Sequence, residues 1–232
     1  MNRPLLLLVE DDSDLRGVLA LALRSYGYEV KEAGTGSEAL RLIRARTPDA
    51  VILDLGLPDI DGFEVTASIR AEHELPIIVL SGFAEEQHQI RALDGGANDY
   101  VTKPFREREL MARVRVALRR PTRLEQDSDA LTLGDLRLEA GKRRVFLAGV
   151  EVKLTRTEFE LLDTLARKAN RVVSHRQLLA AVWGSAHLNE VHYLRVYVKL
   201  LRQKIEQDPT HPKRLLTALG IGYRLVTAEA VP

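Results

Sequence analysis

Residues 51–62 read VILDLGLPDIDG, a short apolar run that ends in an acid and is followed by Gly, Pro and Asp. Such a run, bounded by turn residues, is typical of a strand buried in a parallel sheet. The stretches LLLLVEDD at 5–12 and DYVTKPF at 99–105 have the same form. Because the carboxyl ends of parallel strands meet at one edge of a sheet, we expect the charged residues there to converge. The expected site comprises Glu10, Asp11, Asp54 and Lys103.

Strand and helix patterns alternate along the first 120 residues. Strands are expected at 5–9, 28–33, 51–55, 76–80 and 99–102, and helices at 14–25, 37–46, 62–72, 85–94 and 106–120. Five successive βα units predict an α/β domain, with a five-stranded parallel, doubly wound sheet and helices on both faces.

The expected site has the composition of an aspartyl-phosphate site. Clustered carboxylates repel one another unless a cation lies among them, and oxygen ligands of this kind suit Mg²⁺. Asp54 would be the nucleophile, since it follows a long apolar strand, and Lys103 would place a positive charge near the phosphoryl oxygens. Ser81, at the end of PIIVLS, would donate its hydroxyl to another oxygen.

Other acids near these strands have structural explanations. Asp12 or Asp14 is expected to cap the helix that starts near Leu15, and Asp59 and Asp61 are expected to form a turn and an N-cap. The string DIDG at 59–62 also resembles the nucleophile motif of haloacid dehalogenase-type phosphatases. Leu-Pro precedes this string where a long apolar strand should end, so Asp54 is the better nucleophile. A phosphatase or phosphotransferase enzyme that uses the acidic cluster is an alternative, although no general base or substrate-binding motif is recognisable.

The strings VEDD, DLGLPDIDG, LSG and YVTKPF together resemble the receiver domain of two-component response regulators, over residues 3–120. The resemblance implies that a sensor histidine kinase phosphorylates Asp54. It also implies that Asp11, Asp54 and the carbonyl of Gly56 bind Mg²⁺, with Glu10 acting through water. Ser81 and Tyr100 would be the switch pair, the two side chains that report phosphorylation to the far face of the domain. The Lys103–Pro104 bond would be cis.

The same resemblance implies a homodimer formed through the fourth and fifth helices and the strand between them. The chain has four of the expected charged residues for this face, namely Asp99, Glu109, Arg113 and Arg120. Gln89 and Asn98, however, stand where the family usually has a base and an acid. A regulator that binds DNA without phosphorylation is therefore a second alternative.

The second half of the chain has a different pattern of elements. Residues 121–130 read as a linker, and residues 131–154 contain four short β segments separated by turns. Helices follow at 155–168, 174–183 and about 189–206, the first two opened by capping signals at Thr155 and Ser174. The hairpin LLTALGIGYRLV turns through Gly220–Gly222, and residues 228–232 form a tail.

The last of these helices carries two side-chain stripes. An apolar stripe is formed by Val191, Leu194, Val198, Leu201 and Ile205, and a basic one by Arg195, Lys199 and Arg202. A basic helix face beside a hairpin favours a DNA-binding module, in which the helix lies in the major groove and the hairpin reaches the minor groove.

Residues 131–227 resemble the winged-helix effector domain of the OmpR/PhoB subfamily, through LTRTEFELL, SHRQLL, VWG and GIGYR. The resemblance implies that double-stranded DNA is bound by Arg195, Tyr197, Lys199, Arg202 and Arg224. It also implies that the turn at 184–189 contacts RNA polymerase, whereas Trp183 is expected in the core. Within the subfamily these strings are most similar to regulators of potassium-transport operons.

Composition agrees with two soluble domains that have different partners. Residues 1–120 carry a net charge of −4 and residues 121–232 a net charge of +5, and the basic half suits a polyanion. The chain has no cysteine, which excludes a disulfide framework and thiolate chemistry. The apolar stretch in MNRPLLLLVEDD is too short for a signal peptide or membrane span, so we expect a cytoplasmic protein with no membrane partner.

Overall fold

The computed structural model of the protein describes residues 3–83, 85–119 and 130–227. The chain forms two compact units, Met1–Arg119 and Arg120–Pro232. The predicted linker at 121–130, apart from Ala130, and the predicted tail at 228–232 lie outside the described residues, as does Arg120.

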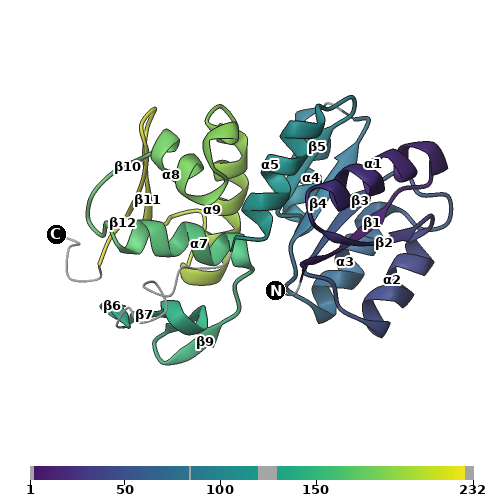
Figure 1. Ribbon diagram of the computed structural model, residues 1–232. Helices are drawn as coiled ribbons and strands as arrows, with labels where there is room; N and C mark the ends of the chain where they lie inside the picture. The colour runs from purple at the N-terminus through teal and green to yellow at the C-terminus, as the bar shows by residue number, and fades with distance from the viewer. Residues whose placement is uncertain (1–2, 84, 120–129, 228–232) are drawn as a thin grey trace. The chain divides into compact units, whose positions relative to one another are not determined.

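The first unit contains one parallel sheet with the strand order β2-β1-β3-β4-β5 (Figure 1). Its strands are β1 (Leu5–Val9), β2 (Glu29–Ala33), β3 (Ala50–Asp54), β4 (Ile77–Ser81) and β5 (Asp99–Thr102). All residues of β1, β3 and β4 are buried, because these strands lie inside the sheet and are covered on both faces.

Five helices cover the two faces of this sheet. They are α1 (Ser13–Ser25), α2 (Gly36–Ala45), α3 (Gly62–Glu72), α4 (Glu86–Asp94) and α5 (Glu107–Ala117). Figure 1 shows α1 and α5 on one face and α2 and α3 on the other. Leu19 and Leu23 of α1 share a hydrophobic core with Leu110 and Val114 of α5. The predicted doubly wound α/β fold is therefore confirmed.

Aspartates fix the starts of three helices. Asp12 accepts hydrogen bonds from the amides of Asp14 and Leu15 and caps α1, as predicted. Asp61 caps α3 through the amide of Phe63. Asp59, expected to act within its own turn, instead accepts from the amides of Gly36 and Ser37, at 2.8 and 2.9 Å, and so stabilises the first turn of α2.

The second unit begins with an antiparallel sheet in the order β6-β7-β8-β9, as predicted for residues 131–154. The strands are β6 (Leu131–Leu133), β7 (Leu136–Glu139), β8 (Arg144–Leu147) and β9 (Val150–Val152), with a short 3-10 helix, η1 (Ala140–Lys142), between β7 and β8.

Among the residues of this unit that the structure describes, three helices and a second sheet follow. The helices are α7 (Arg156–Ala166), α8 (His175–Val182) and α9 (Val191–Ile205), and a 3-10 turn, η2 (Ser185–His187), lies before α9. The capping boxes predicted at Thr155 and Ser174 are both present. The sheet has the order β10-β12-β11, with β10 (Val173–Ser174), β11 (Leu215–Ala218) and β12 (Gly222–Leu225).

Two elements differ from the sequence-based expectation. The helix expected at 106–120 ends at Ala117 among the described residues, and β10 was not predicted, because a two-residue strand has no periodicity of its own. Over the ranges that the structure describes, no helix is both long and apolar enough to cross a membrane.

Candidate functional site

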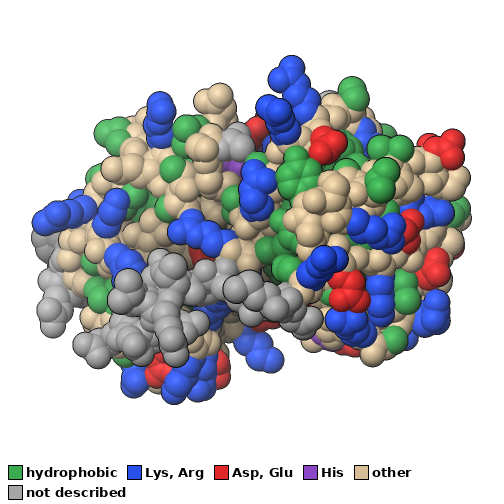
Figure 2. Space-filling view, in the orientation of Figure 1, with side chains coloured by type: hydrophobic (Ala, Val, Ile, Leu, Met, Phe, Trp, Pro, Cys, Tyr) green, Lys and Arg blue, Asp and Glu red, His purple; other side chains and the backbone are tan. Residues whose placement is uncertain are grey.

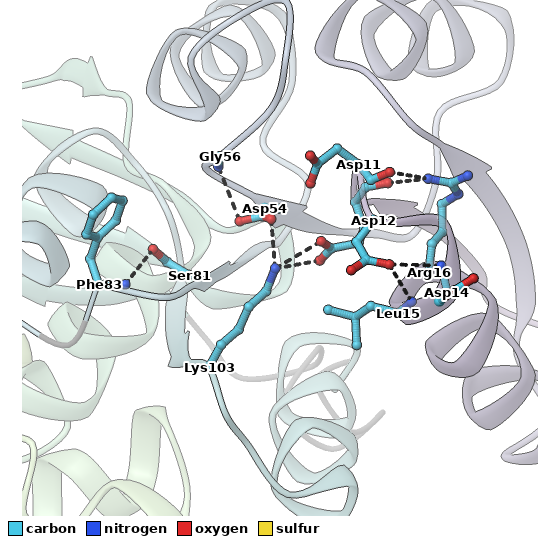
Figure 3. Close-up of polar contacts among 11 residues, drawn as sticks. Asp11, Asp12, Asp14, Leu15, Arg16, Asp54, Gly56, Ser81, Phe83 and Lys103 are labelled. Carbon is cyan, nitrogen blue, oxygen red and sulfur yellow. Dashed lines mark hydrogen bonds and ion pairs between the residues drawn. The ribbon is translucent and has the colours of Figure 1, made fainter.

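The four charged residues expected to converge do lie together at the carboxyl edge of the parallel sheet, where Figure 3 shows Asp11, Asp54 and Lys103. Glu10 and Asp11 follow β1, Asp54 ends β3, and Lys103 follows β5. Carboxylate oxygens of Glu10, Asp11 and Asp54 lie within 4.8 Å of one another. The strand pairing brings them together, since β1 and β3 are neighbours in register, with Val9 opposite Leu53.

Lys103 joins the two buried carboxylates of this cluster. Its Nζ lies 2.7 Å from Asp54 Oδ2 and 2.8 Å from Glu10 Oε2. The Glu10 side chain is 1% exposed and that of Lys103 22% exposed, so the lysine is the partner of the pair that solvent reaches. The Lys103–Pro104 bond is cis, as the resemblance implied.

The electrostatics of the cluster show an excess of negative charge. Burial raises the pKa of Glu10 to about 7, although the hydrogen bond from Lys103 opposes this, and the charge of Asp54 raises it further. Burial lowers the pKa of Lys103, but its bonds to Asp54 and Glu10 outweigh this effect and the net pKa is raised. Lys103 is thus held as a cation, and one positive charge does not compensate three carboxylates.

This donor set fits a hard divalent cation. Mg²⁺ prefers oxygen ligands and is usually bound by one or two carboxylates, with water and phosphate oxygens filling the remaining positions. Asp11 is exposed, while Glu10 and Asp54 are buried, so the cluster opens to solvent on one side. The amide of Gly56 donates to Asp54 Oδ1 at 3.2 Å and helps to orient that carboxylate.

Two residues that support the cluster were not predicted. Arg16 of α1 donates from Nη1 to the carbonyls of Glu10 and Asp11, at 2.5 and 3.2 Å, and so holds the loop after β1. Gly62 starts α3 against the end of β3, where a Cβ would lie 2.7 Å from the Asp54 carbonyl. An arginine inside a helical pattern and a glycine at a helix start give no signal of such contacts in one sequence.

Ser81 and Tyr100 lie beside the cluster, on β4 and β5. Ser81 Oγ accepts from the amide of Phe83 at 3.2 Å, and the Tyr100 hydroxyl donates to the Phe83 carbonyl at 2.7 Å. Burial raises the pKa of Tyr100, which is 3% exposed, while a hydrogen bond with Ser81 acts in the opposite direction. Phe83 therefore receives contacts from both residues of the predicted switch pair.

Residues expected across a dimer interface are paired within the chain. Arg113 donates to Asp99 at 2.8 Å and to Glu109 at 2.7 Å, and Arg113 and Asp99 are both buried. Asn98 also points inward, since its Oδ1 accepts from Arg70 Nη2 and from the amide of Ile77. In this structure, Asp99 and Arg113 are thus bonded to each other within one chain, and their role in a dimer face stays a prediction.

In the second unit, α9 separates apolar from basic side chains much as predicted. Leu194, Val198, Leu201 and Ile205 are buried, Val191 is half-buried, and Arg195 and Lys199 are exposed. Tyr197 corrects the prediction: it is 2% exposed and its ring lies 5.2 Å from that of Trp183. Tyr197 therefore belongs to the core with Trp183 and is not available to contact DNA in this structure.

Arg202, also predicted to contact DNA, makes hydrogen bonds within its own domain. It is half-buried, its Nε and Nη2 donate to the carbonyl of Leu215 at 3.0 and 2.7 Å, and Nη2 also donates to Thr217 Oγ1 at 2.9 Å. The residue predicted to contact phosphates thus connects α9 to β11. Arg224 is exposed on β12, opposite Leu216.

The surface of this unit is suited to an anionic partner. Figure 2 shows basic side chains spread over its visible face.

The turn at 184–189, expected to contact RNA polymerase, contains the 3-10 turn η2, and His187 within it is fully buried. Its backbone is thus held by the core.

Comparison with known proteins identifies both units. The sequence matches the response regulator receiver domain over residues 6–115 and the C-terminal domain of transcriptional regulatory proteins over residues 149–225. It is 46% identical to the transcriptional regulatory protein KdpE of Mycobacterium tuberculosis and 44% identical to the KDP operon transcriptional regulatory protein KdpE of Escherichia coli; each alignment covers 95% of this chain and 98% of the relative. Identity to the DNA-binding response regulator MtrA of Mycolicibacterium smegmatis is 38%, with 96% of each chain covered.

Solved structures give the same result. A point mutant of RitR matches with a TM-score of 0.75 at 26% identity, over 96% of this chain and 98% of its own. DrrB of Thermotoga maritima, an OmpR/PhoB homologue, matches with a TM-score of 0.52 at 30% identity, over 97% and 100%. The relatives named here are regulators rather than metabolic enzymes, which argues against the phosphatase alternative. The chain belongs to the OmpR/PhoB-type response regulators, and it is a KdpE-type DNA-binding regulator with a receiver domain and a C-terminal transcriptional regulatory domain.

Proposed function

We propose that a sensor histidine kinase phosphorylates Asp54 and that phosphorylation controls the binding of this regulator to promoter DNA. The observation that carries the proposal is the contact of Lys103 Nζ with both Asp54 and Glu10 beside the exposed carboxylate of Asp11. This contact supports the proposal, because an attacking carboxylate oxygen needs a fixed cation and acidic metal ligands close to it.

Phosphoryl transfer requires little from the protein beyond position and charge. An oxygen of Asp54 attacks the phosphorus of a phosphohistidine, an O–P bond forms, and the N–P bond breaks with its electron pair left on the imidazole nitrogen. Lys103 remains protonated and compensates charge on the phosphoryl oxygens. Asp11, Asp54 and the carbonyl of Gly56, with Glu10 acting through water, would hold Mg²⁺, which would supply further positive charge beside these oxygens.

The signal would leave the site through Ser81 and Tyr100. When the Ser81 hydroxyl turns to donate to a phosphoryl oxygen, the Phe83 amide loses its acceptor, and the loop that also holds the Tyr100 hydroxyl rearranges. Ser81 and Tyr100 lie on adjacent strands, with Ser81 opposite Thr102. A small movement at Asp54 can thus reach Tyr100 and the face formed by α4, β5 and α5.

The receiver of residues 1–120 would dimerise through this face, using Asp99, Glu109, Arg113 and Arg120. The effector domain of residues 131–227 would bind double-stranded DNA with Arg195, Lys199 and Arg224, and the turn at 184–189 would contact RNA polymerase. Potassium-transport genes are the proposed target, since the relative from Escherichia coli is named for the KDP operon. We place this function in the cytoplasm.

Phosphorylation of the Asp54→Ala variant tests the proposal. Incubated with Mg²⁺ and acetyl phosphate, a small phosphodonor, the full chain should gain one phosphoryl group by mass spectrometry and the variant none. Asp61→Ala is a matched control, because Asp61 caps α3 and should not affect phosphorylation. Uptake of phosphate by Asp54→Ala, with its circular dichroism unchanged, would contradict the proposal.

A further inference from the structure

The turn between β11 and β12 carries two exposed apolar side chains. Leu219 is 88% exposed, the highest value among the large hydrophobic residues that the structure describes, and Ile221 is 58% exposed. Between them, Gly220 has φ +70, a conformation that favours glycine. A single exposed leucine is ordinary, but two large apolar side chains on either side of one tight turn form a defined apolar tip. We call Leu219–Ile221 the wing tip.

The wing tip is held by its neighbours. The carbonyl of Ile221 accepts from the amide of His175, at the start of α8, at 2.9 Å, and Gly222 pairs with Ser174 of β10. A Cβ on Gly222 would lie 1.9 Å from the Val173 carbonyl, so only glycine allows this close approach. Figure 1 shows β11 and β12 side by side, with their turn at the end of the hairpin away from α7.

Arg202 holds the other strand of the hairpin to α9, through the carbonyl of Leu215 and the hydroxyl of Thr217. The tip is thus supported by α8 on one side and by α9 on the other. A tip fixed in this way can bind with little loss of conformational entropy.

The groups around the tip indicate which partner it fits. Arg224 is exposed on β12, Arg195 and Lys199 are exposed on α9, and residues 121–232 carry a net charge of +5. An apolar tip on a hairpin that also carries an exposed arginine, in a domain of net positive charge, matches the DNA minor groove, where phosphates line both edges and apolar wedges such as leucine and isoleucine enter between base steps.

We propose that Leu219 and Ile221 form an apolar wedge that enters the DNA minor groove beside the segment bound by α9, and that it favours A·T pairs there. The preference follows from the groove floor, since the amino group of guanine projects into it and would lose its hydrogen bond to water beside an apolar side chain. The inference extends the DNA-binding function and does not depend on phosphorylation of Asp54.

A selection from a random duplex library tests the wedge. The full chain, Leu219→Ala and Leu219→Arg would each select sequences, and affinities for the duplex selected by the unaltered chain would be measured over a range of salt concentrations. Leu219→Ala should lose the A·T preference on the flank but keep the base preference at the segment bound by α9. It should bind about tenfold more weakly. The slope of log K against log salt should stay unchanged, because no phosphate contact is lost. Leu219→Arg should steepen the slope by about 0.9, because an arginine there neutralises a phosphate.

Val150→Ala provides the matched control, since Val150 is 70% exposed on β9 in the other sheet. This variant should change neither the A·T preference on the flank nor the affinity for the duplex. Equal affinity and equal flanking preference in Leu219→Ala and the unaltered chain would overturn the wedge alone. Loss of transcription without any change in DNA binding would also overturn it and assign the tip to a protein contact. Failure of the unaltered chain to select any sequence would overturn DNA recognition itself.

Discussion

Lys103 stabilises two carboxylates that would otherwise repel each other. Glu10 is 1% exposed and depends on Lys103 for two hydrogen bonds, at 2.8 and 3.0 Å. In Lys103→Met, Glu10 must stay charged without this partner or take up a proton. Because the lysine is partly exposed and Glu10 can be protonated near neutral pH, we expect the free energy of unfolding at pH 7 without Mg²⁺ to fall by about 2 kcal/mol, less than for a fully buried pair. Urea denaturation followed by far-ultraviolet circular dichroism measures the loss.

Mg²⁺ should reverse much of this loss, because a divalent ion compensates the same carboxylates. It should also bind more tightly to Lys103→Met, where the ammonium no longer competes for Asp54. Two controls are available: Lys142→Met, which removes an exposed lysine 3.9 Å from the half-buried Glu139, and the fluorescence of Trp183, the only tryptophan, which lies in the second unit. Equal destabilisation with and without Mg²⁺ would show that Lys103 does not act through charge.

Asp59 gives the stability of the first unit a defined pH dependence. Hydrogen bonds from Ser37 and Gly36 lower the pKa of Asp59 to about 2, against a usual value of 3.8. A lowered pKa means that the carboxylate contributes its full stabilisation above about pH 4 and loses it as the pH falls through 2. Asp59→Asn should therefore be less stable than the unaltered chain at pH 6, and the difference should narrow below pH 4. Hydrogen exchange of the Ser37 amide measures this stability difference between the two proteins. A difference that stays constant with pH would show that Asp59 stabilises the unit through packing and not through its charge.

At the scale of elements, the sequence predicts best what local chemistry decides. Buried runs predicted β1, β3 and β4, and the pattern of Thr155 with Glu158 predicted the start of α7. The convergence of the acidic residues followed from strand direction alone. Asp59 capping α2 and Arg16 holding the loop after β1 could not be predicted, because each depends on tertiary contacts between separate elements.

The stripes of α9 show the same limit. Lys199 and Arg202 are three residues apart, and helical periodicity places both on the basic stripe, yet Lys199 is exposed while Arg202 is bonded to β11. The resemblance implied a DNA contact for Tyr197, but its ring packs against Trp183. A single sequence gives the side of a helix on which a residue lies, but it does not show which neighbouring strand or ring that side meets.

The difference between Lys199 and Arg202 predicts opposite behaviour in DNA binding. Lys199→Ala should remove a phosphate contact and make the salt slope shallower by about 1. Arg202→Ala should leave the slope unchanged but weaken binding, because β11 loses the support of α9, and it should lower the free energy of unfolding by about 1–2 kcal/mol through the lost hydrogen bonds. Fluorescence anisotropy between about 50 and 200 mM salt gives the slopes. Thr217→Val, which removes one acceptor of Arg202, should weaken DNA binding and lower the free energy of unfolding by less than Arg202→Ala does. A shallower slope in Arg202→Ala would show instead that Arg202 contacts a DNA phosphate.

For the whole molecule, the internal pair of Asp99 and Arg113 limits how strongly the receiver can dimerise in solution. A symmetric dimer that uses these two residues must replace a buried bond of 2.8 Å with an equivalent one across the interface. Exchanging one such pair for another yields little net free energy. We therefore expect dimerisation mainly on DNA, where two adjacent half-sites raise the effective concentration of the second molecule.

The salt dependence of DNA binding can count the molecules that bind together. On a duplex with two half-sites about one helical turn apart, the full chain treated with beryllofluoride, a mimic of aspartyl phosphate, should bind as a pair. Twice as many phosphates are then neutralised, so the slope of log K against log salt should be about twice that on a single half-site. The untreated chain should bind each half-site independently with the single-site slope, and Asp54→Asn should behave like the untreated chain under both conditions. Identical slopes and affinities with and without beryllofluoride would support the alternative of a regulator that binds DNA independently of phosphorylation.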